Sequence, residues 1–68
     1  MSHKIIRLPE VKQRTGLSRS TIYLRMSKGE FPLNISLGER AVGWVELDVD
    51  IWLQDRIEAS RNVGAENE

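Results

Sequence analysis

The chain has 68 residues, with ten Lys and Arg, ten Asp and Glu, one His and no Cys. At this length we expect one small domain that buries only about 60% of its unfolded surface. The lack of cysteine excludes disulfides and thiolate metal sites, and no apolar run reaches the roughly 18 residues that span a bilayer. We therefore expect a soluble, cytoplasmic protein with no cofactor, no metal and no membrane partner.

The charges are distributed unevenly along the chain. Residues 1–40 carry eight cations and three acids, a net charge of +5, whereas residues 41–68 carry two cations and seven acids, a net charge of −5. Such asymmetry indicates a nucleic-acid or membrane surface on the basic side. The alternative is a solvated surface whose two halves attract one another.

A first helix is predicted to begin at Leu8-Pro9-Glu10. Proline suits the first position of a helix because its missing N–H would have no partner there, and an acid in the first turn is favoured by the helix dipole. Val11 is the expected core contact. Gly16 is the expected stop, since a glycine inside a helix costs roughly 1 kcal/mol relative to alanine.

A second helix is predicted over residues 19–28, with Ser18 as its N-cap and Gly29 at its end. Only residues 16–18 separate the two helices, which is the connection typical of a helix-turn-helix unit. Phe31-Pro32 excludes further helix, because proline lacks the N–H and favours an extended predecessor.

Two short apolar alternations follow, Ile35 with Leu37 and Val42 with Trp44, and they predict a hairpin whose loop is Gly38-Glu39-Arg40. Trp44 is expected in the core rather than as a base-stacking platform.

A last amphipathic helix is predicted from about Glu46 to about Ala59. Its packed face is expected to hold Val49, Trp52, Leu53 and Ile57. Residues 60–68 are small and polar and are expected to form a disordered tail. The predicted fold is mostly α with a small β-hairpin, a winged helix-turn-helix domain over residues 1–59.

Candidate catalytic groups are few. His3 lies near the N-terminus, outside the predicted core. The acids Asp48, Asp50 and Asp55 fall on the exposed side of the last helix, where they most simply solvate it. We expect no catalytic site.

The second helix carries the informative surface. On a helical wheel Ile22 and Met26 share its buried face, while the outer face holds hydroxyls, a phenol and one leucine, bordered by cations. Such a helix fits the DNA major groove, where side chains near its N-terminus contact base edges. The candidate DNA-contacting residues, with the hairpin tip included, are Ser18, Arg19, Ser20, Thr21, Tyr23, Leu24, Lys28 and Arg40.

Several candidates have a structural alternative. The structural role expected of Ser18 is that of an N-cap, although the backbone N–H groups at the same helix end could also hold a phosphate. Tyr23 either caps the core with its ring or donates its hydroxyl to a phosphate. Leu24 is either an isolated exposed residue or a contact to a thymine methyl. An ordinary solvated surface is the alternative for the cations Arg19, Lys28 and Arg40.

The segments "LPEVKQRTGLSRSTIYLRMSKGEFP" and "SLGERAVGWVELDVDIWLQDRI" resemble the AlpA family of prophage transcriptional regulators, relatives of phage excisionases and of the MerR-type DNA-binding domain. The resemblance covers roughly residues 4–59. It implies a winged helix whose recognition helix begins at Ser18 and whose wing bears Gly38-Glu39-Arg40. Leu33 stands where family members often carry a basic residue, so no backbone contact is implied there. The long coiled-coil helix and effector domain of MerR-type regulators are not implied.

The resemblance implies a regulator of prophage or mobile-element genes that binds double-stranded DNA sequence-specifically. Its expected target is a promoter or attachment region, and its expected location is the nucleoid. Phosphate contacts are expected from Arg19, Tyr23, Lys28 and Arg40, and base contacts from Ser20, Thr21 and Leu24. One alternative is an excisionase-like factor that bends DNA beside an integrase. A second is a protein-interaction module without DNA binding. Further expected partners are a second copy on an adjacent site, RNA polymerase or an integrase.

Overall fold

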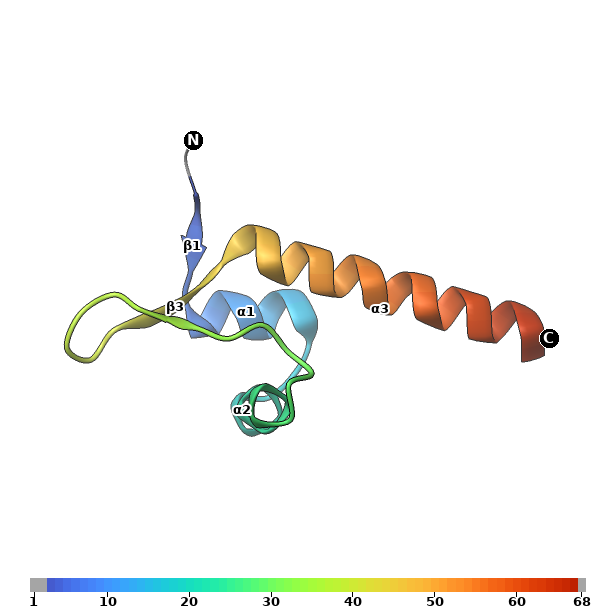
Figure 1. Cartoon of the computed structure of the whole chain (residues 1–68), viewed down its shortest axis with the longest axis horizontal. Coiled ribbons are helices and arrows are strands. Elements are labelled where there is room, and N and C mark those ends of the chain that lie inside the picture. The colour runs from blue at the N-terminus through green and yellow to red at the C-terminus, as the bar shows by residue number, and fades with distance from the viewer. Residues whose placement is uncertain (1–2, 68) are drawn as a thin grey trace.

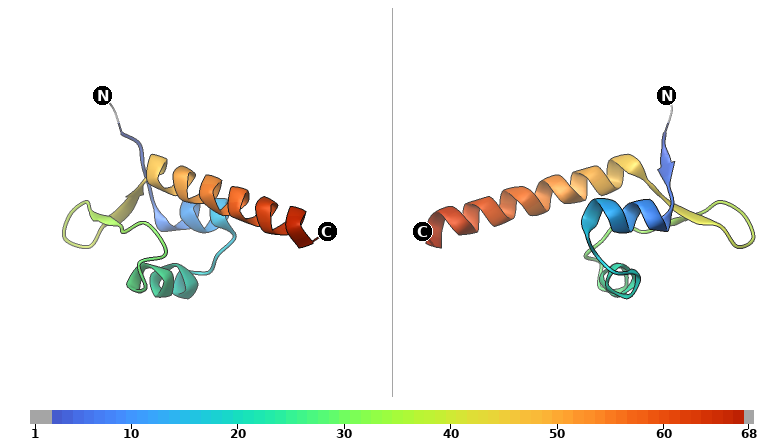
Figure 2. Two further views of the ribbon diagram at one scale, coloured as in Figure 1. Left: turned by 45° about the vertical axis from the view of Figure 1, so that its right-hand side comes forward. Right: turned by 180° about the vertical axis from the view of Figure 1, so that it is seen from behind.

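A computed structural model describes residues 3–67, and the side chains of residues 3–61. The elements are β1 (Ile5–Ile6), α1 (Leu8–Thr15), α2 (Arg19–Ser27), β2 (Ile35–Ser36), β3 (Val42–Val45) and α3 (Glu46–Asn67). The strands form an antiparallel sheet in the order β1-β3-β2. In Figures 1 and 2, α1 lies between α2 and α3, and the β2–β3 loop and the far end of α3 project at opposite ends. The predicted winged helix-turn-helix class is confirmed.

The ends of α1 and α2 follow the backbone chemistry that the sequence predicts. Gly16 adopts the left-handed conformation (φ 72°), and its N–H donates to the Lys12 carbonyl at 2.8 Å, which ends α1. The Ser18 hydroxyl accepts from the Thr21 N–H at 3.2 Å, so the predicted N-cap of α2 is confirmed. Gly29, also at φ 72°, follows the end of α2.

The sheet contains one strand more than the predicted hairpin. β2 pairs with β3 in the register Ile35 to Gly43, and β1 pairs with the other edge of β3 in the register Ile6 to Trp44. Gly43 permits this close approach, because a Cβ placed on it would lie 2.5 Å from Cγ2 of Ile5. The two-residue β1 strand was not predicted, since so short a segment carries no alternation to detect.

The core gathers one buried side chain from each element except β2, together with Phe31 from the segment after α2. Its buried members are Ile6, Val11, Ile22, Phe31, Trp44 and Val49. The Trp44 indole N–H donates to the Pro32 carbonyl at 3.1 Å, so this fully buried ring retains its hydrogen bond. Among the described side chains no buried polar atom lacks a partner.

The last helix differs most from the prediction. α3 continues past Ala59 to Asn67, so residues 60–67 extend the helix and the predicted helix end is wrong. Ile57, expected on the packed face, is 43% exposed, whereas Val49 is buried. Once a helix exists, each added residue gains a hydrogen bond without a nucleation cost, so a weak sequence can extend it. The division into a DNA-binding domain over residues 1–59 and a tail over residues 60–68 stays a prediction. No helix in the described part of the chain is long and apolar enough to cross a membrane.

Candidate nucleic-acid interface

The second helix is anchored by one face and open on the other. Ile22 is fully buried, and Met26 packs half-buried against the same core. In Figures 1 and 2 α2 lies at the edge of the molecule, with α1 on its inner side. The predicted contact residues Ser18, Arg19, Ser20, Leu24 and Lys28 are exposed, while Thr21 and Tyr23 are half-buried. The outer face of α2 is therefore accessible to a large ligand.

Three hydroxyls cluster at the N-terminus of α2. The Ser18 hydroxyl lies 2.9 Å from that of Thr21 and 3.2 Å from that of Ser20. Ser18 is engaged as the cap, which restrains its rotamer, whereas the Ser20 side chain lies on the exposed surface. The cluster leaves Ser20 as the hydroxyl best placed to reach a base edge or a phosphate.

Tyr23 joins the core to the outer face. Its ring meets Trp44 edge-on, with centroids 6.2 Å apart and planes at 71°. The phenol oxygen accepts from the Asn34 side-chain amide at 3.5 Å, so its own hydrogen can still be donated. On the outer side, the Arg19 guanidinium carbon lies 5.0 Å from the ring centroid. The two roles considered for Tyr23 are thus compatible, since the ring packs inward while the hydroxyl remains available.

The electrostatic character of this surface is uniformly positive. Residues 18–29 contain Arg19, Arg25 and Lys28 and no acid. Within the described side chains, none of these three cations forms an ion pair. Arg40 is likewise exposed, in the β2–β3 loop, which projects away from α2 (Figure 1). The structure therefore presents one basic region, the face of α2, and a single further cation, Arg40, which stands beside Glu39 at the tip of the hairpin.

Two other cations of the basic half face carboxylates instead. Nη2 of Arg14 lies 2.7 Å from Glu10 and 2.6 Å from Glu46, and its Nη1 lies 3.3 Å from Asp50. The hydrogen bond to Glu46 raises the pKa of Arg14 above its ordinary value. Lys4 lies 3.8 Å from the same Glu46 carboxylate. Part of the charge asymmetry thus serves attraction between the two halves of the chain, which is the alternative that the sequence left open. The sequence does not reveal that Arg14 and Glu46 are the partners, because they are far apart in the chain.

The surface holds no group of metal-ligating residues in the described part of the chain. Asp48, Asp50 and Asp55 are exposed, as predicted for the outer side of α3. Leu33 is the most exposed large apolar side chain of the described residues, at 68%, and Leu24 on α2 is 54% exposed. Neither leucine is needed for the core, and Leu24 stands among the polar groups of the α2 face.

Comparison with known proteins places these features in a family context. Residues 4–57 match the family described as "Prophage CP4-57 regulatory protein (AlpA)". The chain is 48% identical over 54 residues to the uncharacterized protein ORF88 of Enterobacteria phage P4, across 79% of this chain and 61% of that protein. It is 41% identical over 59 residues to the DNA-binding transcriptional activator AlpA of Escherichia coli K12, across 78% of this chain and 84% of that protein. The match thus spans about three fifths of the phage protein and most of the bacterial one.

Proposed function

This chain belongs to the AlpA family of prophage regulatory proteins, and from that premise we propose that it binds double-stranded DNA and regulates genes of a prophage or another mobile element. The family is one of regulators and not of enzymes. The observation that carries the proposal is the face of α2, which is exposed, holds cations without acids, and is fixed to the core from behind by Ile22. A rigid positive helix of this kind suits the polyanionic major groove.

The N-terminal half of α2 would supply the base contacts. Ser20 and Thr21 carry hydroxyls that can donate to or accept from base edges, and Leu24 presents an apolar end to a thymine methyl group. The N-cap at Ser18 holds the helix start in one conformation, so these side chains meet the groove with little ordering cost.

The cations around this face would contact phosphates and fix the register of the protein on the duplex. Arg19 is held over the ring of Tyr23, which restricts its rotamers before binding. Lys28 stands at the other end of α2, and the hydroxyl of Tyr23, which accepts from the Asn34 amide, would donate its hydrogen to a third phosphate oxygen. Arg40 on the hairpin would reach the neighbouring backbone or minor groove, as the wing of a winged helix does.

The regulation would operate by occupation of a promoter or attachment region. The relative in E. coli is a transcriptional activator, so activation through contact with RNA polymerase is one outcome, and occlusion of a promoter is another. A single domain with one recognition helix offers few contacts, so we propose that copies occupy adjacent sites. An integrase would be the partner if the target is an attachment site.

A footprint on the DNA that flanks the gene encoding this chain tests the proposal. We expect a protected site near a promoter, lost when Arg19 and Lys28 are both changed to Ala. The matched control is Arg61→Ala, which removes an exposed cation from α3. An array of protected sites at an attachment locus would identify the excisionase-like role instead. The flanking DNA must be protected at a protein concentration at which unrelated control DNA stays unbound. If it is not protected at any such concentration, the result contradicts DNA binding.

A further inference from the structure

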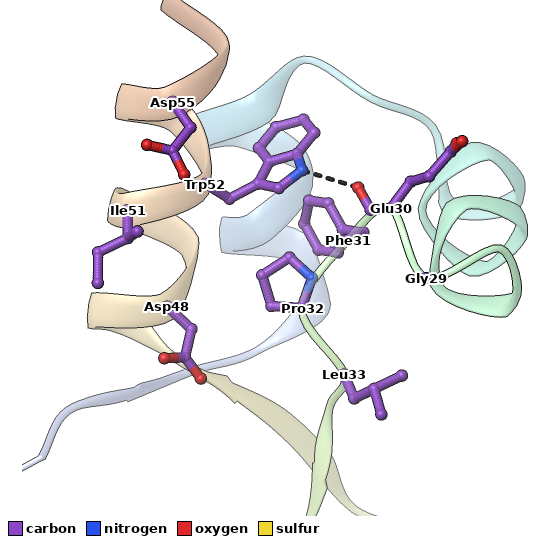
Figure 3. Close-up of a pocket in the computed structure, with 9 residues that line it drawn as sticks. All are labelled: Gly29, Glu30, Phe31, Pro32, Leu33, Asp48, Ile51, Trp52 and Asp55. Carbon is purple, nitrogen blue, oxygen red and sulfur yellow. Dashed lines mark hydrogen bonds between the residues drawn. The ribbon is translucent and has the colours of Figure 1, made fainter.

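An open groove of about 550 Å³ lies between the segment that follows α2 and the first turns of α3 (Figure 3). Its floor is apolar and includes Phe31, Pro32 and Trp52. Leu33 and Ile51, which are 68% and 51% exposed, stand at its edges. Groove volumes of this order accommodate a few side chains of a ligand. None of the eight predicted DNA-contacting residues lines it.

The rim of the groove carries only negative charge. Glu30, Asp48 and Asp55 line it and are exposed, and its lining contains no Lys or Arg. Within the described side chains these three acids form no ion pair. By contrast, Glu46 and Asp50, which lie on α3 with Asp48 and Asp55, are both neutralised by Arg14. The carboxylates at the groove are therefore available to a positive ligand, and they repel phosphates.

The floor is already rigid before anything binds. Phe31 and Trp52 pack edge-on with centroids 4.8 Å apart. The Trp52 indole N–H donates to the Glu30 carbonyl at 2.8 Å, which ties the two walls together (Figure 3). A preformed site of this kind costs little to order, so even a short contact can give measurable affinity.

We propose that this groove is the docking site for a segment of another protein that carries one large apolar side chain flanked by Lys or Arg. The apolar side chain would lie against Phe31 and Trp52, with the cations opposite the acids of the rim. A second copy of this chain suits the groove less well. Its exposed Leu24, which has neighbouring cations, stands on the face proposed to contact DNA, and its exposed Ile57 is flanked by the acid Glu58 as well as by Arg56.

The test is an NMR titration of the ¹⁵N-labelled full chain, without DNA, by three end-blocked peptides, GKKLKKG, GEELEEG and GKKGKKG. We expect GKKLKKG to shift the Trp52 indole resonance and the amides of residues 29–33 and 48–55. The two other peptides should bind at least about tenfold more weakly, because one lacks the cations and the other lacks the apolar group.

Variants separate the groove from general attraction to an acidic helix. Changing Asp48 and Asp55 to Asn should weaken GKKLKKG about tenfold. The matched control, Glu39→Gln with Glu58→Gln, removes two exposed acids outside the groove and should leave the affinity unchanged.

Three results would overturn the proposal: no shifts at the groove, equal shifts with GEELEEG, or equal loss in the control variant. Shifts at the groove that grow with protein concentration alone would assign it to a second copy and also overturn the proposal. Because no DNA is present, none of these results depends on the function proposed for α2.

Discussion

The indole N–H of Trp52 on α3 donates to the main-chain carbonyl of Glu30 at 2.8 Å, just beyond the end of α2. The carbonyl of Pro32, two residues after Glu30, accepts from the indole N–H of Trp44 on β3 at 3.1 Å. Two tryptophans from different elements thus hold the segment that connects α2 to the hairpin. The orientation of α2 relative to the hairpin therefore depends on both rings.

The two indoles should differ in their effect on stability. Trp44→Phe empties part of a fully buried site and leaves the Pro32 carbonyl without its donor, so we expect a loss of about 2 kcal/mol or more. Trp52→Phe alters a half-buried ring whose acceptor lies near solvent, and should cost about 1 kcal/mol. Urea unfolding measures both. Equal losses would contradict the assignment of Trp44 as the central core residue.

Substitutions at Gly43 and Gly38 give a second comparison, between a crowded glycine and an open one. A methyl group on Gly43 would meet Ile5 at 2.5 Å and the Ile6 carbonyl at 3.1 Å, so Gly43→Ala should separate β1 from β3 and cost about 1–3 kcal/mol. Nothing lies within 4 Å of a Cβ on Gly38, in the loop of the hairpin, and Gly38→Ala should change stability by less than about 0.5 kcal/mol. Thermal unfolding of the two variants checks this; a destabilised Gly38→Ala with an unaffected Gly43→Ala would contradict the pairing of β1.

Arg14 should contribute to the stability of the fold and not to the affinity for DNA. Arg14→Gln leaves Glu10, Glu46 and Asp50 close together without their shared cation, so we expect a lower urea midpoint. The difference from the wild type should shrink in 1 M salt, where the Debye length falls to about 3 Å. DNA affinity, corrected for the folded fraction, should not change. A reduced salt dependence of DNA binding in this variant would show that Arg14 contacts phosphate.

Leu24 tests which face of α2 meets the bases. Leu24→Ala removes an exposed apolar side chain, so stability should change by less than about 0.5 kcal/mol. If Leu24 contacts a thymine methyl, the variant should lose about 1–3 kcal/mol of discrimination at one base pair and keep the rest of its preference. Binding to a set of single-base variants of the footprinted site measures this. An unchanged preference at every position would place another face of α2 in the groove.

Local signals made most of the fold predictable. The cap at Ser18 and the left-handed Gly16 and Gly29 depend on residues within one turn, so the sequence reveals the limits of α1 and α2. The hairpin and the burial of Trp44 could be predicted from the apolar positions and the glycine-containing loop, although Ile35 and Leu37 are 41% and 44% exposed. The candidate contact residues on α2 could be named for the same reason, because the helical period fixes which side chains share the outer face.

The features that sequence reasoning missed depend on distant pairs or on helix propagation beyond the predicted end. β1 exists because Ile6 meets Trp44 across the sheet. Arg14 is neutralised by Glu46, which lies on another helix. The extension of α3 beyond Ala59 follows from helix propagation, which continues through Gly64 although a glycine inside a helix is unfavourable. The groove beside Trp52 also needs two elements at once and could not be read from either.

The central claim, that the face of α2 binds the DNA backbone, is tested most directly by the salt dependence of DNA affinity, measured by fluorescence anisotropy. Four to six phosphate contacts predict a slope of log K against log salt of roughly −4 to −5 for the wild type. Changing Arg19 and Lys28 to Ala should make that slope less steep by about two, whereas Arg61→Ala should not change it. A wild-type slope near zero, or an unchanged slope in the α2 variant, would contradict the account.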